Sequence, residues 1–148
     1  MPLRTTKHWF GVVLDCPDAP ALADFYERLL GWRVFTRTPE WATLAPSADR
    51  GYNLAFATEP NYERPVWPSE PGRQGMMLHL DLEVDDLDVA VAYALSCGAE
   101  EATFQPQSDV CVMLDPAGHP FCLYLDPADE DAEKDGADPE KAQDPSSS

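Results

Sequence analysis

The side chain in this sequence best suited to chemistry is His79, which stands in the stretch MMLHLDLEVDD, residues 76–86. Apolar and acidic residues alternate there, as they do in a half-buried β-strand, so His79 is expected to share a face with Asp81 and Glu83. An imidazole beside carboxylates can bind a metal ion or act as a general base near neutral pH. His79 is therefore the catalytic candidate, with Asp81, Glu83 or Asp15 as its carboxylate partner.

Aromatic rings are the other candidates for a binding site. The first half of the chain and residues 59–75 carry an excess of rings, and rings that line a cleft can stack on a planar ligand. Many single rings of this kind belong to a protein core instead. The candidate ligand-binding residues are Trp9, Trp41, Tyr52, Phe56, Tyr62, Trp67, His79 and Cys122.

The four cysteines show no C-x-x-C spacing of a metal or redox motif. No long apolar run follows the N-terminus, so neither a secretory signal nor a transmembrane segment is expected. Reduced thiols and a cytoplasmic location are the resulting expectations. Cys122 is interpreted as a small buried filler and His119 as a turn residue.

Two sets of elements with the same order must position these side chains. Each half predicts a strand, a helix and three more strands, which is the pattern of an internal repeat. Module one, residues 8–58, has strand candidates at 8–15, 32–38, 41–46 and 52–58, and a helix from Asp18 to Gly31. Residues 59–75 hold four prolines and predict a linker. Module two, residues 76–126, has strand candidates at 78–84, 101–107, 109–114 and 120–126, and a helix from Asp85 or Asp86 to Gly98.

The acidic balance of the chain limits its partners. The 148 residues carry a formal net charge of −17, which repels phosphate backbones and anionic lipids. Nucleic acid and membranes are therefore not expected as partners. Residues 127–148 contain many acids and no large apolar side chain, so they predict a disordered acidic tail behind a single domain, residues 1–126.

Three motifs resemble those of the vicinal oxygen chelate superfamily, the glyoxalase, bleomycin-resistance and dioxygenase group. PDAPALADFYERLLGWRV (17–34) resembles its D-x(6)-FY-x(3)-LG signature, HLDLEVDDLDVAVAYALSCGA (79–99) its H-x(3)-EVDD opening of the second module, and LDPAGHPFCLY (114–124) its D-P-x-G-N-x-I-E-L ending. The subgroup suggested is the short glyoxalase-like domain. The resemblance implies an α+β fold in which two βαβββ modules form a curled mixed sheet around a cleft.

Metal-dependent members of that family hold a divalent cation with four side chains, one from the first and one from the last strand of each module. Carried over by position, the four places are Gly11, Ala55, His79 and Cys122, with Asn53 instead of Ala55 if the register differs by one pleat. Gly11 and Ala55 carry no donor atom. A catalytic metal generally needs three protein ligands and an open position.

His79 and Cys122 would supply two ligands at most. A third ligand from Asp15, Asp81 or His8 would require unusual geometry. The expectation is that no metal is bound and that no other cofactor is needed; if a metal is held, His79 and Cys122 are its ligands. Without a metal, the family's Lewis-acid chemistry is lost.

The function predicted from these observations is binding of an uncharged or cationic small organic ligand in an aromatic-lined cleft, with the metal site lost. The first alternative is an enzyme of lyase, isomerase or dioxygenase type that uses His79 as a base or in an atypical metal site. The second alternative is a dimeric interaction module that uses the linker face. The rings of NYERPVWP, residues 61–68, would then form a pocket lid or a dimer contact. The sequence does not fix the oligomeric state, and a homodimer is the alternative to a monomer.

Overall fold

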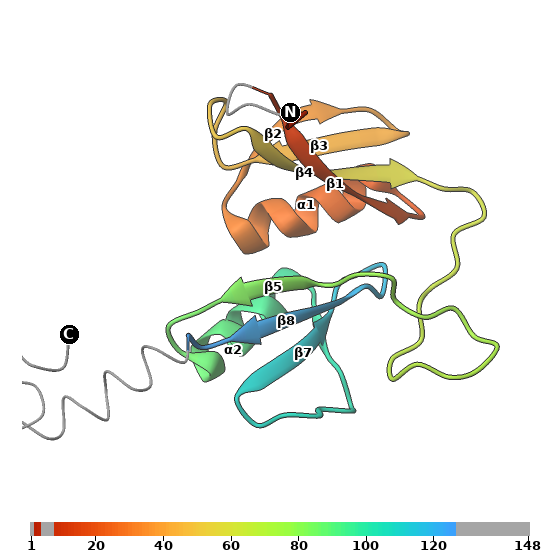
Figure 1. Ribbon diagram of the computed structural model, residues 1–148, viewed down its shortest axis with the longest axis vertical. Helices are drawn as coiled ribbons and strands as arrows, with labels where there is room; N and C mark the ends of the chain where they lie inside the picture. The colour runs from red at the N-terminus through yellow and green to blue at the C-terminus, as the bar shows by residue number, and fades with distance from the viewer. Residues whose placement is uncertain (1, 4–7, 127–148) are drawn as a thin grey trace, which may run out of the picture.

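The computed structural model describes residues 2–3 and 8–126, and Figure 1 shows that they form two modules of the same plan. Module one contains β1 (Phe10–Cys16), α1 (Ala19–Leu30), β2 (Arg33–Arg37), β3 (Trp41–Ala45) and β4 (Tyr52–Thr58). Module two contains β5 (Leu80–Glu83), α2 (Leu87–Cys97), β6 (Glu100–Glu101), β7 (Val110–Leu114) and β8 (Pro120–Tyr124). The repeat and the α+β fold predicted from the sequence are confirmed, whereas the expected acidic tail lies outside the described residues.

The two sheets have matching topologies. Their strand orders are β1-β4-β3-β2 and β5-β8-β7-β6, so in both modules the first strand runs parallel to the last and the other neighbours are antiparallel. A parallel pair needs a long crossover connection, and each helix together with the antiparallel strands provides one. The registers pair Gly11 with Asn53 in module one and Asp81 with Cys122 in module two.

Both helices begin and end where the sequence predicts. The Asp18 side chain accepts a hydrogen bond from the Ala21 backbone N–H, and the Asp86 side chain accepts one from the Val89 N–H. These bonds satisfy backbone donors that have no partner within the helix. Each helix then ends at a glycine in the left-handed region, Gly31 in α1 and Gly98 in α2, where a side chain would be strained.

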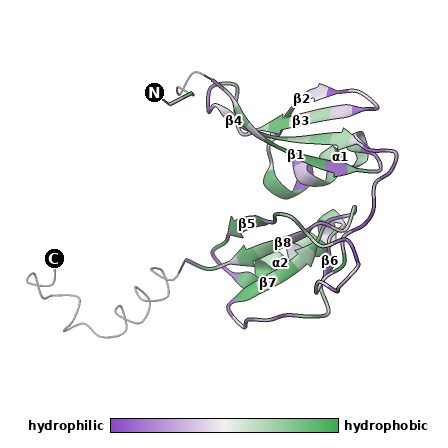
Figure 2. Ribbon diagram, turned by 45° about the vertical axis from the view of Figure 1, so that its right-hand side comes forward, coloured by the Kyte–Doolittle hydropathy of each residue, from purple (hydrophilic) through white to green (hydrophobic). Residues whose placement is uncertain are grey.

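One continuous core joins the modules through α1. Figure 1 shows α1 between its own sheet and module two, and Figure 2 shows hydrophobic residues concentrated on the strands and helices. Phe25 and Tyr26 of α1 are fully buried, and both rings pack against Phe121 of β8. On the other side of α1, Tyr26 stacks on Phe56 of β4 with ring centroids 5.4 Å apart. The core therefore requires both halves of the chain.

A polar network crosses the same junction. Asp115, in the turn before β8, is 1% exposed, and its carboxylate accepts hydrogen bonds from the Tyr26 hydroxyl at 2.7 Å and from two backbone N–H groups. His119 Nδ1 lies 2.8 Å from Asp115 Oδ2, and His119 Nε2 lies 2.8 Å from the backbone oxygen of Asp15 in β1. Both ring nitrogens of His119 are thus engaged. His119 is more than the turn residue expected from the sequence, because it connects the two modules.

Module two differs from the sequence-based expectation at two places. The strand expected over 101–107 is reduced to β6, because the Gln105 carboxamide bonds the backbone N–H and oxygen of Val112, both at 2.8 Å, where a strand ladder would run. β5 begins at Leu80, so His79 precedes the strand instead of lying in it. Within residues 2–3 and 8–126, no helix has the length and apolar character needed to cross a membrane.

Candidate functional site

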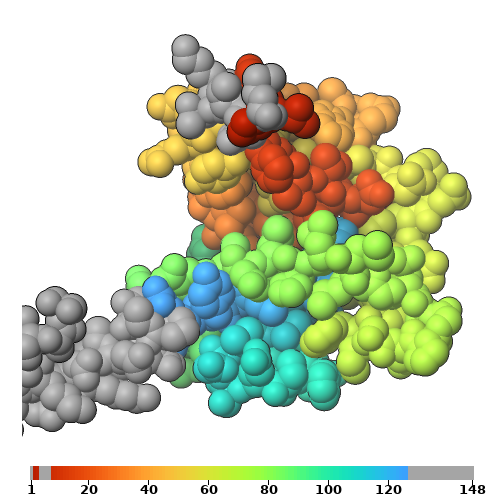
Figure 3. Space-filling model, in the orientation of Figure 1, coloured from red at the N-terminus to blue at the C-terminus, as the bar shows by residue number. Residues whose placement is uncertain are grey.

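A pocket of about 350 Å³ opens where the two modules and the linker meet, and we call it the junction pocket. Volumes of a few hundred Å³ are typical of sites for small organic molecules. In Figure 3 the linker and the segment before β5 lie against β1, so these segments close the junction. The walls include Val13 and Asp15 of β1, Glu59, Tyr62 and Glu63 of the linker, Met77 and Leu78 before β5, and His119 and Pro120.

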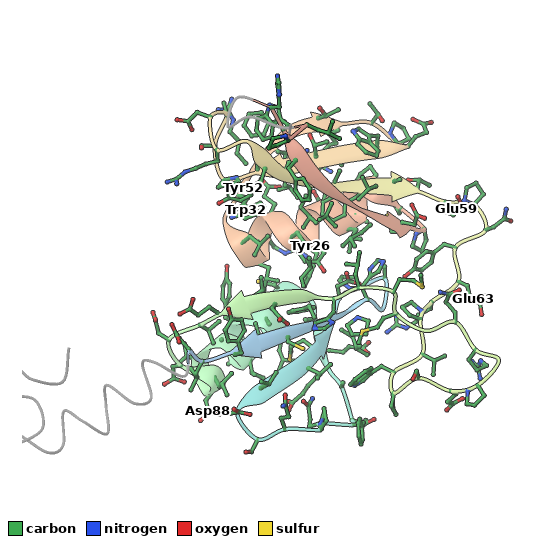
Figure 4. All side chains as sticks on the ribbon, viewed as in Figure 1. Tyr26, Trp32, Tyr52, Glu59, Glu63 and Asp88 are labelled. Carbon is green, nitrogen blue, oxygen red and sulfur yellow. The ribbon has the colours of Figure 1, made fainter. Side chains whose placement is uncertain are left out.

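Among the described residues, three carboxylates line the junction pocket, and no lysine or arginine does. They belong to Asp15, at the end of β1, and to Glu59 and Glu63 of the linker. Figure 4 shows Glu59 and Glu63 together on the linker side of the molecule. None of the three forms an ion pair within the described part of the chain, although Glu59 accepts a hydrogen bond from the Asn61 backbone N–H. Within the described residues, these three carboxylates thus have no lysine or arginine partner, and the basic side chain of the wall, His119, is bonded to Asp115 instead.

Tyr62 forms a fixed aromatic wall of this pocket. Its hydroxyl donates a hydrogen bond of 2.6 Å to the backbone oxygen of Ala117, and its ring is tilted against the His119 imidazole with centroids 5.7 Å apart. Burial, followed by the nearby negative charge of Asp115, raises the pKa of Tyr62 to about 12. The phenol is therefore neutral at physiological pH, and the charge of the pocket comes from its carboxylates.

The remaining wall of the junction pocket is apolar and adaptable. Met76, Met77 and Leu78 approach it from the segment before β5, and Met77 is 93% exposed. Methionine side chains are flexible and polarizable, so they can pack against ligands of varied shape. The pocket combines negative charge, one aromatic ring and an apolar surface.

The rings expected to line one cleft do not converge. Phe56 is completely buried in the core against Tyr26, so no ligand on the surface can touch it. Tyr52 packs edge-on against Trp32, and Trp67 donates a hydrogen bond from its indole N–H to the Phe104 backbone oxygen. Among the predicted rings, only Tyr62 lines the junction pocket.

Trp9 lines a second hollow, of about 300 Å³, on the sheet of module one. The rings of Trp9 and Phe35 meet edge to face there, with centroids 6.4 Å apart, and Asn53 also lines the hollow. The predicted Trp41 is 37% exposed on β3 but is not part of either wall. Ligand contacts by Trp9 and Trp41 stay predictions.

The predicted residues His79 and Cys122 come together outside the junction pocket, and Asp81 joins them. The Nε2 atom of His79 lies 3.2 Å from Asp81 Oδ1. One potential ligand atom from each of the three residues lies within 4.8 Å of the others. Burial, followed by the negative charge of Asp81 and a hydrogen bond to its carboxylate, raises the pKa of the Cys122 thiol. The predicted role of His79 as a base stays a prediction.

Comparison with known proteins decides the family. The family model of the glyoxalase-like domain matches residues 11–124, almost the whole described chain. The chain belongs to the glyoxalase-like domain family. It is therefore a member of the vicinal oxygen chelate superfamily, as its motifs indicated. No curated protein matches this glyoxalase-like domain.

Solved structures share the fold at low sequence identity. A glyoxalase/bleomycin resistance protein/dioxygenase family enzyme from Burkholderia phytofirmans PsJN is 19% identical, with a TM-score of 0.58 over 78% of this chain and 95% of its own. A glyoxalase-related enzyme from Fulvimarina pelagi is 20% identical, with a TM-score of 0.58 over 79% and 86%. Lactoylglutathione lyase from Agrobacterium tumefaciens is 14% identical, with a TM-score of 0.52 over 84% and 94%. These structural similarities establish only the fold of the glyoxalase-like domain and no activity.

The four-position metal site implied by the family does not fit this glyoxalase-like domain. At Gly11, an added Cβ would lie 2.2 Å from Asn53 Oδ1, so the Asn53 carboxamide fills the space that a ligand side chain would need. At Ala55, which is 2% exposed, only a methyl group is present. Module one therefore offers no side-chain ligand at Gly11 or Ala55, and the donor atom in this space is the carboxamide oxygen of Asn53, the alternative position. Because Gly11 and Ala55 leave the four-ligand set incomplete, no catalytic step through it follows.

Sequence reasoning missed Glu59 and Glu63 of the junction pocket and the network behind it, and it named Asp15 as a partner of His79 or a third metal ligand instead of a pocket residue. Glu59 and Glu63 lie in a linker without periodicity, and no local pattern brings them beside Asp15, more than forty residues earlier. The DPAGHP turn, residues 115–120, was visible as a turn signal, but its contact with β1 depends on how the modules pack. The one sequence signal for these carboxylates is the excess of acidic over basic residues in the domain before the acidic tail.

Proposed function

We propose that this glyoxalase-like domain binds a small organic cation with an apolar or aromatic body in the junction pocket. The observation that carries the proposal is the wall of three carboxylates, from Asp15, Glu59 and Glu63, with no lysine or arginine among the described residues of the lining. A cation that enters such a wall gains Coulomb attraction and displaces no internal partner. At about 6 Å, one carboxylate contributes roughly 0.7 kcal/mol in a water-like dielectric and roughly 2.8 kcal/mol at an effective dielectric constant of 20.

The other walls select the rest of the ligand. The Tyr62 ring is held in place by its hydrogen bond to Ala117 and can take part in a cation–π contact. Met76, Met77 and Leu78 offer apolar surface that can follow the body of the molecule. An anion would meet three like charges, so the sign of the ligand charge is the sharpest part of the proposal.

Thermal unfolding with three matched probes tests the sign of the charge. The probes are benzyltrimethylammonium, uncharged benzyl alcohol and phenylacetate, which share one ring size. A ligand that binds only the folded state at 100 times its dissociation constant stabilises it by about 2.7 kcal/mol. We expect only the ammonium probe to raise the unfolding temperature, and added salt to reduce the shift. An equal shift with benzyl alcohol, or a larger one with phenylacetate, contradicts the proposal.

A cytoplasmic location belongs to the same proposal. All four cysteines, Cys16, Cys97, Cys111 and Cys122, are free thiols. Free thiols persist in reducing compartments, where disulfides are rare. The protein would then meet its cationic ligand inside the cell.

A further inference from the structure

We propose that His79, Asp81 and Cys122 bind a zinc-class divalent cation on the sheet of module two. These residues offer an imidazole nitrogen, a carboxylate oxygen and a thiol sulfur, which are the three donor types that zinc accepts. The site is distinct from the junction pocket, because none of the three residues lines that pocket. It also departs from the sequence-based expectation that no metal is bound.

The register of the sheet brings the three donors together. Asp81 is the direct partner of Cys122 in the parallel ladder between β5 and β8. His79 lies just before β5, and its side chain turns toward Asp81, because its Nε2 atom is 3.2 Å from Asp81 Oδ1. Of the four positions carried over from the family, Gly11, Ala55, His79 and Cys122, two carry a donor atom, and both of these lie in module two. Asp81 occupies none of the four positions that the family implies, and among the third ligands considered from the sequence (Asp15, Asp81 and His8) the structure brings Asp81 to His79 and Cys122.

The distances suit a metal after small side-chain movements. Zinc ligands lie about 2.0–2.3 Å from the ion, so two donors of a tetrahedral site are roughly 3.3–3.8 Å apart. His79 Nε2 and Asp81 Oδ1 are already 3.2 Å apart, and all three donors lie within 4.8 Å of one another. The side chains of His79 and Asp81 are 40% and 57% exposed, so they can rotate without disturbing the core.

Three protein ligands would leave a fourth position open. Zinc with three protein ligands and an exchangeable position is the arrangement found in catalytic sites, whereas structural zinc sites are closed by four. The thiol favours a borderline or soft cation over Mg²⁺ or Ca²⁺, which take oxygen ligands. The site therefore selects by donor type as well as by charge.

Cobalt titration of the full chain, freed of metal by a chelator, tests this inference. Co²⁺ reports bound thiolate through a sulfur-to-cobalt charge-transfer band, which carboxylates alone do not produce. We expect one Co²⁺ per chain, this band, and displacement of Co²⁺ by Zn²⁺. Cys122→Ser should abolish the band, while the matched variant Cys111→Ser, at a thiol on the neighbouring strand β7, should retain it.

Two substitutions at exposed positions keep the test independent of folding. His79→Ala and Asp81→Asn should each weaken Co²⁺ binding at least about tenfold, the lower end of what loss of even an outer-sphere partner costs. A titration without the charge-transfer band overturns the inference, and so does a band that survives Cys122→Ser. Equal affinities for the wild type and Asp81→Asn also overturn it. Because Asp15, Glu59 and Glu63 take no part, failure here leaves the proposed cation pocket standing.

Discussion

His119 Nε2 lies 2.8 Å from the backbone oxygen of Asp15, so the turn before β8 in module two is bonded to the end of β1 in module one. On the other side of the imidazole, Nδ1 contacts the buried Asp115. The same connection places two residues of the pocket wall, His119 and Asp15, beside each other. The pocket is thus a product of module packing and cannot form in either module alone.

The Asp115 network should be a major source of stability. Asp115→Ala removes the acceptor of the Tyr26 hydroxyl and of His119 Nδ1, and we expect it to lower the free energy of unfolding by about 3–5 kcal/mol. Tyr26→Phe removes one hydrogen bond to a charged group and should cost about 1.5–3 kcal/mol. Urea unfolding measures both.

Tyr93→Phe is the matched control for Tyr26→Phe. The Tyr93 hydroxyl also bonds across the junction of the helices, to the backbone oxygen of Arg28, but its side chain is exposed. We expect a cost of about 0.5 kcal/mol or less, because water replaces a lost partner at the surface. If Tyr93→Phe lowers the free energy of unfolding as much as Tyr26→Phe does, the buried Asp115 network is not the source of stability proposed above.

Stability should fall at alkaline pH through Tyr62. Its pKa is raised from 10.0 to about 12 by burial and then by the charge of Asp115, so the folded state binds this proton more tightly than the unfolded state. The stabilisation is fully present below about pH 10 and is lost as the pH rises toward 12. Tyr62→Phe should therefore flatten the decline of unfolding free energy over this range. An unchanged decline would show that the proton of Tyr62 is not linked to folding.

The reactivity of Cys122 should respond to Asp81. Burial raises the thiol pKa first, and the negative charge of Asp81 raises it further. Asp81→Asn removes that charge, lowers the pKa of Cys122 and should accelerate its alkylation by iodoacetamide at pH 8, because the thiolate is the nucleophile. Peptide mass spectrometry can follow each thiol separately.

A second thiol provides the matched comparison. The pKa of Cys111 is raised to about 11 by burial and then by Glu101, so Glu101→Gln should accelerate Cys111 and leave Cys122 unchanged. Conversely, Asp81→Asn should leave Cys111 unchanged. Acceleration of both thiols by either substitution would indicate a general loosening of module two and contradict the assigned contacts.

Local signals predicted the fold well. Asp18 and Asp86 begin their helices, Gly31 and Gly98 end them, and the repeat of strand, helix and three strands is present. These features depend on neighbours in the sequence, where propensity and capping act. The strand expected over 101–107 failed because the side chain of Gln105 competes with the backbone ladder, which no period of apolar residues reveals.

The candidate site was predicted much less well, for a physical reason. Phe56 and Tyr62 are both aromatic residues near the middle of the chain, yet one is in the core and the other lines the pocket. Whether an aromatic ring is buried in the core or lines the pocket depends on the packing of α1 and on the path of the linker. Both are set by contacts between residues that are distant in the sequence. Likewise, Asp81 joins His79 and Cys122 through the register of two strands, which the alternation of residues suggests only in part.

Each carboxylate of the junction pocket should contribute separately to binding. Glu63→Gln removes one charge at an exposed position and should weaken binding of benzyltrimethylammonium about 3- to 10-fold, from the Coulomb estimate for one carboxylate in a partly wet pocket. Asp88→Asn is the control, because Asp88 lies on α2 at the far end of module two in Figure 4 and is absent from the pocket. An equal loss for both variants would point to net charge instead of the pocket.

Calorimetric titration of the best-binding cation into two triple variants tests the proposed function most directly. Asp15→Asn with Glu59→Gln and Glu63→Gln neutralises the pocket, whereas Glu27→Gln with Glu40→Gln and Asp88→Asn removes the same three charges elsewhere. We predict at least a tenfold weaker affinity for the first variant and an affinity near that of the wild type for the second. Equal affinities for the two variants, or no binding of any cation by the wild type, would contradict a cation site at the junction of the modules.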